Sequence, residues 1–280
     1  MRLQCGRFAL DLDNPVVMGV LNVTPDSFSD GGRFLDLPAA LAQAERMAVD
    51  GAAIIDVGGE STRPGAAPVD EDEELRRVLP VIERLAGTFS IPISIDTRKP
   101  AVMRRAIAAG ASIVNDVAAL AAPGAMEAVA GSDAAVCLMH MQGEPGTMQD
   151  APRYGDVLAE VRSFLGRRVA ACETAGIARS RIAVDPGFGF GKTLEHNLAL
   201  LAGLPVLAAD GQPVLAGLSR KRMIGSLTGR DGDKRLAGSL AAAVVAAWNG
   251  ARIIRAHDVH ETVDALRVVA AAGAMRDNRE

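Results

Sequence analysis

The sequence is poor in aromatic residues, which make up only 3% of its 280 residues. Its core must therefore be built from Ala, Val, Leu, Ile and Met. Hydrophobic residues still reach 49% and the mean hydropathy is +0.17, which excludes a wholly disordered chain. A mass of 29.1 kDa fits one large domain or two ordinary ones. No linker or change of composition marks a boundary, so we predict a single domain over residues 1–280.

The chain also lacks an excess of positive charge, because its formal net charge is −4 at pH 7. This balance gives no basis for non-specific binding to nucleic acid or to acidic membranes, and we expect neither as a partner. Lysine is scarce, with only four residues: Lys99, Lys192, Lys221 and Lys234. A lysine beside a motif is therefore a selective feature in this chain.

Cysteine is scarce as well, and Cys5, Cys137 and Cys172 are odd in number and far apart. That spacing argues against a disulfide framework or a zinc site. No apolar run approaches the roughly 18 residues of a membrane span, and the N-terminal residues lack the apolar region of a signal peptide. We expect a soluble, cytoplasmic protein with reduced thiols.

Short apolar runs alternate with amphipathic segments along the whole chain. Because the apolar residues in the runs are contiguous, they are typical of parallel strands buried on both faces. The predicted strands are 16–22, 53–57, 92–96, 112–116, 135–140, 181–185, 213–218 and 252–256. Eight strands, each followed by a helix, predict an α/β fold of the (β/α)8 TIM-barrel type. A doubly wound open sheet is the alternative.

The helices between these strands have recognisable ends. The pair Asp70 and Glu73 is typical of a capping box at a helix start. Further helices are predicted over 156–175 and over 236–249, the latter apolar on almost every side and therefore expected to be buried. Glycines that stand just before the next strand are expected to end helices, at Gly51, Gly110, Gly176 and Gly250.

Polar residues occupy the end of every predicted strand. A single aspartate there is usually a turn former or a helix cap. A full set, however, meets at one face of a parallel barrel, where such enzymes keep their active sites, and indicates a site for a small polar ligand. The set comprises Asn22, Asp56, Asp96, Asn115, Asp116, His140, Asp185, Ser219, Arg255 and His257.

Two other patterns do not carry a function of their own. The segment GFGFGKT at 187–193 is one residue short of the P-loop spacing, and we expect its glycines to form a mobile loop over a pocket. His140, His257 and His260 do not have the spacing of metal ligands, so we expect no tightly bound zinc.

The order of several longer strings resembles the dihydropteroate synthase family over about residues 15–260. These strings are GVLNVTPDSFSDGG, DVGGESTRPGA, ISIDTRKP, NDV, MHMQGEPGTMQ, DPGFGFGKT, GLSRKRMIG and RAHDV. The resemblance implies a TIM barrel in which p-aminobenzoate displaces pyrophosphate from (7,8-dihydropterin-6-yl)methyl diphosphate and forms 7,8-dihydropteroate. It also implies Mg²⁺ as cofactor, a homodimer, and inhibition by sulfonamides as p-aminobenzoate analogues.

The resemblance also assigns the pterin site, whose edge needs hydrogen-bond acceptors and one donor. Asp185 and Asn115 match the groups that bind the aminopyrimidine edge, and Lys221 matches the donor to the ring carbonyl. Asp96 matches the acceptor that stabilises positive charge on the pterin as the C–O bond breaks, before the amine attacks. The matching apolar walls are Met139, Phe190 and Gly217.

Diphosphate needs concentrated positive charge, and the family's anion site matches Arg63, Arg255 and His257. Asn22 matches the Mg²⁺ ligand and the diphosphate site, and an amide oxygen suits this hard cation. The resemblance therefore implies four catalytic residues: Asp96, Lys221, Arg255 and His257.

The p-aminobenzoate pocket implied by the resemblance is formed late, by loops. Its residues are Phe28, Thr62, Arg63, Pro64, Phe190, Ser219 and Lys221. The carboxylate is expected near Ser219 and the start of the helix after Arg220. Arg222 stands where some members have serine, which puts a side-chain contact there in doubt. We expect residues 24–33 to act as a lid that carries Phe28.

Three acidic residues are assigned structural roles instead: Asp56 and Glu60 in shaping the second loop, and Asp116. Two other functions remain open. A methyltetrahydrofolate–corrinoid methyltransferase domain shares the pterin-edge residues but needs no diphosphate site. A catalytically inactive paralogue that only binds pterin or a partner predicts losses in the principal residues.

Overall fold

A computed structural model describes residues 1–24, 37–61, 68–144 and 146–277 of the chain. Eight parallel strands form its main sheet, in the order β8-β7-β6-β5-β4-β3-β10-β9. A parallel bridge between Val184 and Val214 joins the two ends of this order, so the sheet closes into a barrel. The closure confirms the predicted TIM barrel and excludes the open sheet. The strands are β3 (Val16–Asn22), β4 (Ile54–Gly58), β5 (Ile93–Asp96), β6 (Ile113–Asp116), β7 (Ala135–Met139), β8 (Ile182–Asp185), β9 (Leu215–Gly217) and β10 (Ile253–Ala256).

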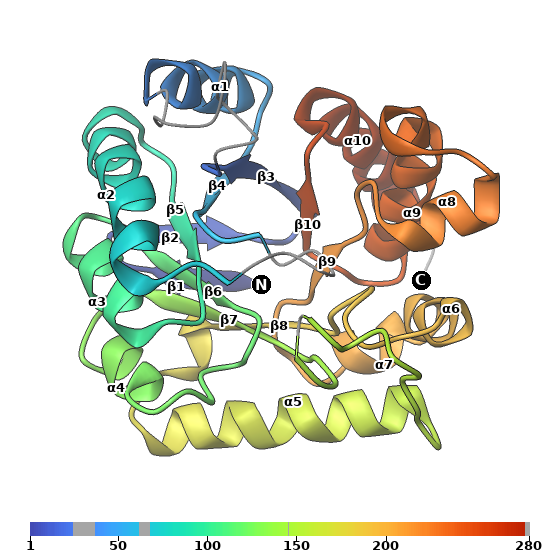
Figure 1. Cartoon of the computed structure of the whole chain (residues 1–280). Helices are drawn as coiled ribbons and strands as arrows, with labels where there is room; N and C mark the ends of the chain where they lie inside the picture. The colour runs from blue at the N-terminus through green and yellow to red at the C-terminus, as the bar shows by residue number, and fades with distance from the viewer. Residues whose placement is uncertain (25–36, 62–67, 145, 278–280) are drawn as a thin grey trace.

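Helices connect successive strands and surround the barrel (Figure 1). They are α1 (Leu37–Val49), α2 (Glu71–Thr88), α3 (Pro100–Ala108), α4 (Ala125–Ala130), α5 (Val157–Thr174), α6 (Leu194–Ala202), α7 (Leu204–Ala208), α8 (Arg222–Thr228), α9 (Leu236–Trp248) and α10 (Val259–Asp277). Short 3₁₀ helices, η1 (Arg179–Arg181) and η2 (Gly232–Arg235), precede β8 and α9.

Local sequence signals place the predicted helix ends correctly. Asp70 caps α2, with its side chain accepting a hydrogen bond from the backbone N–H of Glu73. The Glu73 side chain does not complete the capping box; it pairs with Arg76 and Arg77. The predicted C-terminal glycines have φ angles between +89° and +108°, the left-handed region that ends a helix: Gly51, Gly110, Gly176 and Gly250.

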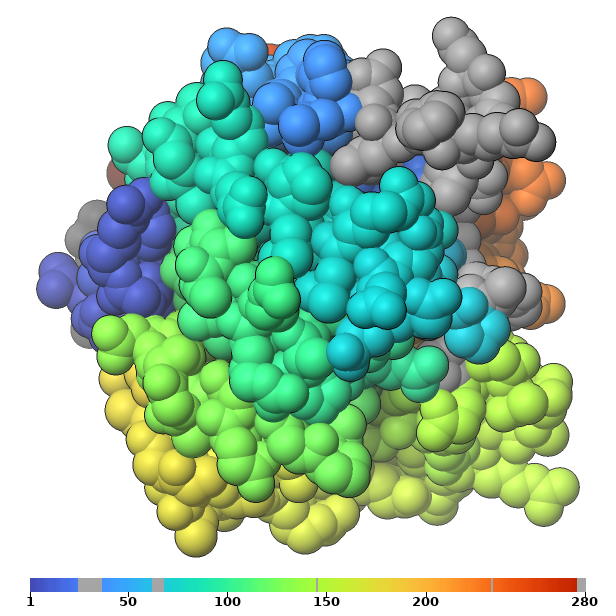
Figure 2. All heavy atoms as spheres, turned by 60° about the vertical axis from the view of Figure 1, so that its left-hand side comes forward, coloured from blue at the N-terminus to red at the C-terminus, as the bar shows by residue number. Residues whose placement is uncertain are grey.

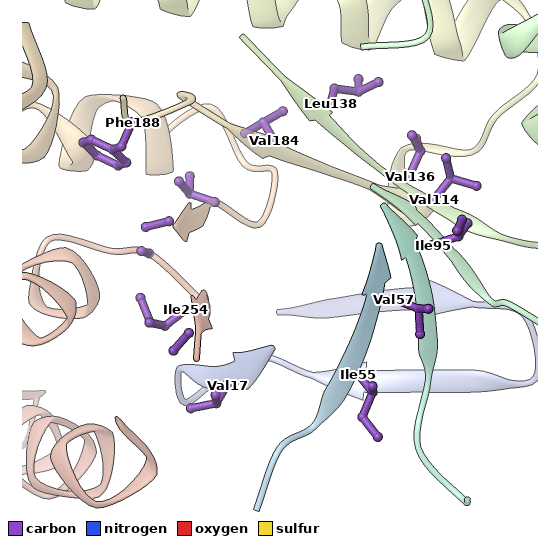
Figure 3. Close-up of a cluster of buried hydrophobic side chains, with 14 of the residues drawn as sticks. Val17, Ile55, Val57, Ile95, Val114, Val136, Leu138, Val184, Phe188 and Ile254 are labelled. Carbon is purple, nitrogen blue, oxygen red and sulfur yellow. The ribbon is translucent and has the colours of Figure 1, made fainter. Parts of the chain in front are cut away.

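Side chains alternate along each strand between the inside of the barrel and the surrounding helices. The outward set packs under the helices, and Figure 3 shows its members on neighbouring strands, among them Val17, Ile55, Val114, Val184 and Ile254. The inward set forms a separate apolar cluster low in the barrel, made of Met18, Ile54, Ile113, Ala135, Cys137, Ala183, Leu215 and Ile253. Both faces of every strand are therefore buried, which explains why the apolar residues run together.

An antiparallel hairpin closes the amino end of the barrel. Its strands, β1 (Arg2–Cys5) and β2 (Phe8–Asp11), were not predicted from the sequence. Leu3, Cys5 and Leu12 pack against the inward cluster and seal it from water. Figure 2 shows the hairpin, in dark blue, as a compact patch on the side of the molecule.

One prediction about burial was partly wrong. Helix α9 buries a face of small residues, including Ala242, Ala243 and Ala246, but it exposes Val245 by 44% and Trp248 by 47%. Within the described residues, no helix combines the length and apolar character needed to cross a membrane.

Candidate active site

Polar residues line the carboxyl end of the barrel because they continue the inward-facing positions of the strands. Two positions after an apolar residue of the inward cluster, four strands carry Asp56, Asn115, Asp185 and Arg255. β9 has a glycine at the equivalent position, Gly217. The strand ends therefore direct a ring of polar groups over an apolar floor, as predicted.

Arg255 lies between two carboxylates near the centre of this ring. Its Nε donates to Asp56 Oδ2 at 2.7 Å, and its Nη2 donates to Asp96 Oδ2 at 2.8 Å. Although burial opposes its charge, Asp56 and Asp96 raise the pKa of Arg255 above its usual value. Burial raises the pKa of Asp96 to about 7, against the attraction of Arg255 and with a contribution from Asp56.

The orientation of Asn115 follows from the same ion pair. Its Nδ2 donates to Asp56 Oδ2 at 3.1 Å. Since a carboxylate accepts hydrogen bonds, the amide must turn its NH₂ toward Asp56, which directs Oδ1 elsewhere. Asn115 is buried, so a ligand at the barrel mouth meets an acceptor held in a fixed direction.

Asp185 and Lys221 form a second charged group in the ring. Asp185 Oδ1 accepts from the Gly187 N–H at 2.7 Å, and burial raises the pKa of its carboxyl group. Lys221 Nζ donates to the Phe188 carbonyl and lies 4.5 Å from the centroid of the Phe190 ring. Burial lowers the pKa of Lys221 to about 8, although the charge of Asp185 opposes this shift.

Gly217 leaves room between the two charged groups. A Cβ placed there would lie 3.8 Å from the Cβ of Arg255 and 4.0 Å from Nζ of Lys221. A side chain longer than a methyl group would fill the space between them. Met139, which is 3% exposed, belongs to the wall at the end of β7.

Ser219 and His257 follow β9 and β10 and contact each other. Ser219 Oγ lies 3.1 Å from Nδ1 of His257 and accepts the His257 backbone N–H at 3.2 Å. Arg220 and Asp258, which follow Ser219 and His257 in the sequence, form an ion pair. The two strand ends are thereby held together beside Arg255.

Asn22, at the end of β3, lies on the Asp96 side of the ring. A Cβ at Gly58 would lie 3.8 Å from Asn22 Oδ1 and 3.7 Å from Asp96 Oδ2, so both groups flank this glycine. Across the ranges that the structure describes, no cluster of three or more His, Cys, Asp or Glu side chains could hold a metal ion. A metal ion at this place could bind the amide oxygen of Asn22, which lies on the same side of the ring as the Asp96 carboxylate.

Several predicted residues lie outside the described residues: Phe28, Thr62, Arg63 and Pro64. The same holds for nearly all of the predicted lid at 24–33. The other predicted site residues are described and lie at the strand ends or in the loops that follow them: Asn22, Asp96, Asn115, Met139, Asp185, Phe190, Gly217, Ser219, Lys221, Arg255 and His257.

The glycine-rich segment at 187–193, for which we predicted a mobile loop over a pocket, packs against the loop that follows β7. A Cβ at Gly187 would lie 1.9 Å from the His140 carbonyl oxygen, and one at Gly191 would lie 2.3 Å from that of Gln142. Only glycine allows the backbone to approach the β7 loop so closely. The segment therefore packs tightly and holds Phe190 at the edge of the site.

The predicted role of Asp56 in shaping the loop after β4 is wrong. Its contacts lie inside the barrel, with Arg255 and Asn115, and not in the loop it was expected to shape. A charged residue within an otherwise apolar buried strand was the available signal, because a buried charge requires a partner. Asp116 does have the structural role expected, since its carboxylate accepts from the N–H groups of Ala118 and Leu120 at 2.7 Å.

Glu60 also has the expected structural role. Its carboxylate accepts a hydrogen bond from Lys99 Nζ at 2.7 Å and from the Val69 N–H at 3.2 Å. Lys99 also pairs with Glu74, which is fully buried in the first turn of α2. These contacts join the loop after β4 to the loop after β5.

Comparison with known proteins defines the class that this fold and site represent. Residues 18–257 match the family described as pterin binding enzyme. The dihydropteroate synthase of Escherichia coli (strain K12) is 54% identical over 279 residues, which cover 100% of this chain and 99% of that protein.

Two solved structures agree. A Yersinia pestis dihydropteroate synthase in complex with a sulfonamide drug has a TM-score of 0.93 and 50% identity, covering 98% of this chain and 100% of its own. A Burkholderia cenocepacia dihydropteroate synthase complexed with 7,8-dihydropteroate has a TM-score of 0.90 and 50% identity, covering 99% and 98%. The chain belongs to the pterin-binding enzymes and, within them, to the dihydropteroate synthase family. It is a transferase with that family's activity.

Proposed function

We propose that the chain forms 7,8-dihydropteroate by a displacement in which the pterin–diphosphate bond breaks before p-aminobenzoate attacks. The observation that supports this most directly is the position of Arg255, which holds the carboxylates of Asp56 and Asp96 at the centre of a ring of pterin-binding groups. Such a ring offers carboxylate oxygens, held in place by Arg255, where a cationic pterin forms. The arylamine is already a nucleophile at pH 7, so no strong general base is needed.

The pterin edge binds between Asn115, Asp185 and Lys221. The fixed Oδ1 of Asn115 and the second carboxylate oxygen of Asp185 accept from the N–H groups of the aminopyrimidine ring. Lys221 Nζ donates to the ring carbonyl. Its contacts with Phe188 O and the Phe190 ring already hold this group at the site before substrate binds, which lowers the cost of ordering it. Met139 and Gly217 form the wall and floor.

Asp96 accepts from a ring N–H and stabilises the positive charge that develops on the pterin. This interaction strengthens as the leaving group departs, so it lowers the barrier more than it strengthens ground-state binding. Its hydrogen bond to Arg255 fixes the carboxylate in place. Arg255 directs its remaining N–H donors toward the diphosphate, together with His257 and Arg63.

Mg²⁺ fits this site as a cofactor that binds with the diphosphate. Asn22 Oδ1 supplies one hard oxygen ligand near Asp96, and Mg²⁺ characteristically takes its other ligands from phosphate oxygens and water. When bound, the ion neutralises charge on the leaving pyrophosphate. We expect Mg²⁺ to tighten diphosphate binding at least tenfold in isothermal titration calorimetry and Asn22→Ala to abolish most of that gain. Equal diphosphate affinity with and without Mg²⁺ would contradict this assignment.

The p-aminobenzoate ring binds against Phe190 and the aliphatic part of Lys221, with Phe28, Thr62 and Pro64 completing the pocket. Its carboxylate lies near Ser219 and the first turn of α8, where backbone N–H groups favour an anion. Arg222 is exposed at the start of α8. The carboxylate is therefore bound by Ser219 and by backbone N–H groups of α8. Sulfonamides bind the same pocket as analogues of p-aminobenzoate.

The experiment that tests this function is a coupled assay of pyrophosphate release with both substrates and Mg²⁺, with a sulfonamide competition arm. We expect turnover by the parent protein and a loss of at least 100-fold with Asp96→Ala or Arg255→Ala, in line with removal of transition-state contacts. Absence of turnover by the parent favours a pterin-binding protein without catalysis. Methyl transfer from methyltetrahydrofolate to a corrinoid, without pyrophosphate release, favours the methyltransferase alternative.

The chain is further proposed to be a cytoplasmic homodimer. Val245 and Trp248 lie one turn apart on the exposed side of α9. The end of this helix joins α6, because Asn249 Nδ2 donates to Leu201 O at 2.8 Å. An exposed apolar strip of this kind suits a second copy of the chain. Analytical ultracentrifugation should show a dimer that Trp248→Lys weakens; a monomeric parent would contradict it. The free, buried cysteines suit a reducing compartment.

A further inference from the structure

Lys192 is the most completely enclosed lysine of the described chain, with 3% of its surface exposed. Its Nζ donates to the carbonyl oxygens of Gly187 and Phe190, each at 2.9 Å, and to that of His140 at 3.3 Å. It also lies 3.0 Å from the Nδ1 atom of the His140 ring. The Lys192 ammonium group therefore connects His140, at the end of β7, with Gly187 and Phe190 in the turn at 187–191.

The turn at 187–191 is bound by side chains at every carbonyl. Lys192 binds the first and fourth carbonyl oxygens, and Lys221 binds the second. Gln149 donates to the third and Tyr154 to the fifth, the latter at 2.9 Å. Among these donors, Lys192 directly follows the turn in the sequence, and it contacts two of the turn's carbonyl oxygens. Losing it removes the donor to the Phe190 carbonyl and leaves the Gly187 carbonyl with the Phe190 backbone N–H, at 3.1 Å.

The groups around the Lys192 Nζ atom are hydrogen-bond acceptors, which suits an amine that donates. Burial lowers the pKa of the His140 imidazole to about 3, so the ring is neutral and can accept through Nδ1. Burial also lowers the pKa of Lys192 to about 7, while Asp185 on β8 opposes that shift and Lys221 after β9 adds to it. Tyr154 packs near the His140 ring, with centroids 6.0 Å apart. Carbonyl oxygens of two loops supply the remaining contacts.

The close contact between the two loops makes this junction sensitive. At Gly187 and Gly191 the backbone touches the β7 loop with no room for a Cβ, as described above. A small displacement of the turn would therefore move both the Phe190 ring and the Phe188 carbonyl that holds Lys221. Both groups belong to the substrate site of the proposed function.

We propose that Lys192 is a positioning residue, whose buried side chain fixes the 187–191 turn against the β7 end and so sets the place of Phe190 in the arylamine pocket. The inference rests on the proposed role of Phe190. Lys192 itself touches no substrate, and its effect passes through the turn.

Lys192→Met tests the proposal because methionine is unbranched, is shorter than lysine by one heavy atom, and lacks the donor. We expect hydrogen–deuterium exchange of residues 187–191 to accelerate in the variant, while strands β3 to β6 retain the parent rates. We also expect KM for p-aminobenzoate to rise about 10- to 100-fold, the size of effect that loosened orientation can produce. Lys234→Met, the same change at an exposed lysine, should alter neither quantity.

A purely structural role would have another signature. It would reduce the folded fraction, and thus the apparent kcat, while KM for p-aminobenzoate stayed at the parent value. An unchanged KM, or unchanged exchange in 187–191, would overturn the proposal. If the parent protein released no pyrophosphate, the proposed function would fail instead, and the exchange measurement alone would then decide whether Lys192 holds the turn.

Discussion

Arg255→Met removes a cation that lies against two carboxylates inside the barrel, those of Asp56 and Asp96. Asp56 is fully buried, Asp96 is 12% exposed and Arg255 is 22% exposed, so solvent screens these pairs weakly. Removing one partner of a buried ion pair typically costs about 3 to 5 kcal/mol, because the remaining charge is left without compensation. For a chain of this length, that corresponds to a fall in Tm of roughly 6 to 20 °C.

The cost should depend on pH, and the sign follows from the carboxyl groups. Asp96 has a pKa of about 7 in the folded protein, above the value of about 3.9 expected in the unfolded chain. The folded state therefore binds more protons between these two values, and stability falls as pH rises through this window. Without Arg255 the pKa of Asp96 rises further. The variant should thus lose more stability, relative to the parent, at pH 8 than at pH 5.5.

Thermal unfolding monitored by circular dichroism at pH 5.5 and pH 8 provides the assay. Arg267→Met is the matched control, since its pair with Asp264 at 3.0 Å is exposed and should change Tm by no more than about 2 °C. A Tm loss for Arg255→Met no larger than that of the control would refute the reasoning. So would a loss that is greater at pH 5.5 than at pH 8.

Three further predictions follow from other parts of the site. Pterin affinity, measured by calorimetry, should fall as pH rises through about 8, where Lys221 loses its proton. The Lys221→Met variant should bind pterin weakly at every pH. Gly191→Ala should lower Tm, because its φ is +61° and a Cβ would lie 2.3 Å from a carbonyl oxygen; Gly166→Ala, in the exposed interior of α5, should raise stability by about 0.5 to 1 kcal/mol. Asp56→Asn should weaken pterin binding about tenfold, since Asn115 could then turn its amide either way; an unchanged affinity would contradict that role.

The barrel was readable from the sequence because its signals are local. A contiguous apolar run marks a strand that is buried on both faces, whatever lies opposite. Asp70 caps α2 and Gly250 ends α9 through hydrogen bonds and φ angles that involve only their neighbours in the chain. The N-terminal hairpin was missed because its strands are four residues long, too short for alternation to stand out.

The ring of site residues was predictable for a related reason. In a parallel barrel, every strand end lies on the same face, so position in the chain already places Asp96, Asn115, Asp185 and Arg255 near one another. Motif order then indicated the ligand class, which the comparisons confirmed.

Partnerships between distant residues were decided only by the tertiary structure. Arg255 binds Asp56 across 199 positions of sequence, and no periodicity specifies which of several carboxylates a buried guanidinium will meet. Lys192 likewise has the same local sequence whether it is solvated or enclosed. Its enclosure depends on how closely the β7 and β8 loops pack, which is set by the curvature of the whole barrel. The sequence by itself determined the elements and the face on which the chemistry lies. The closed barrel determined which charges pair and which loop is held.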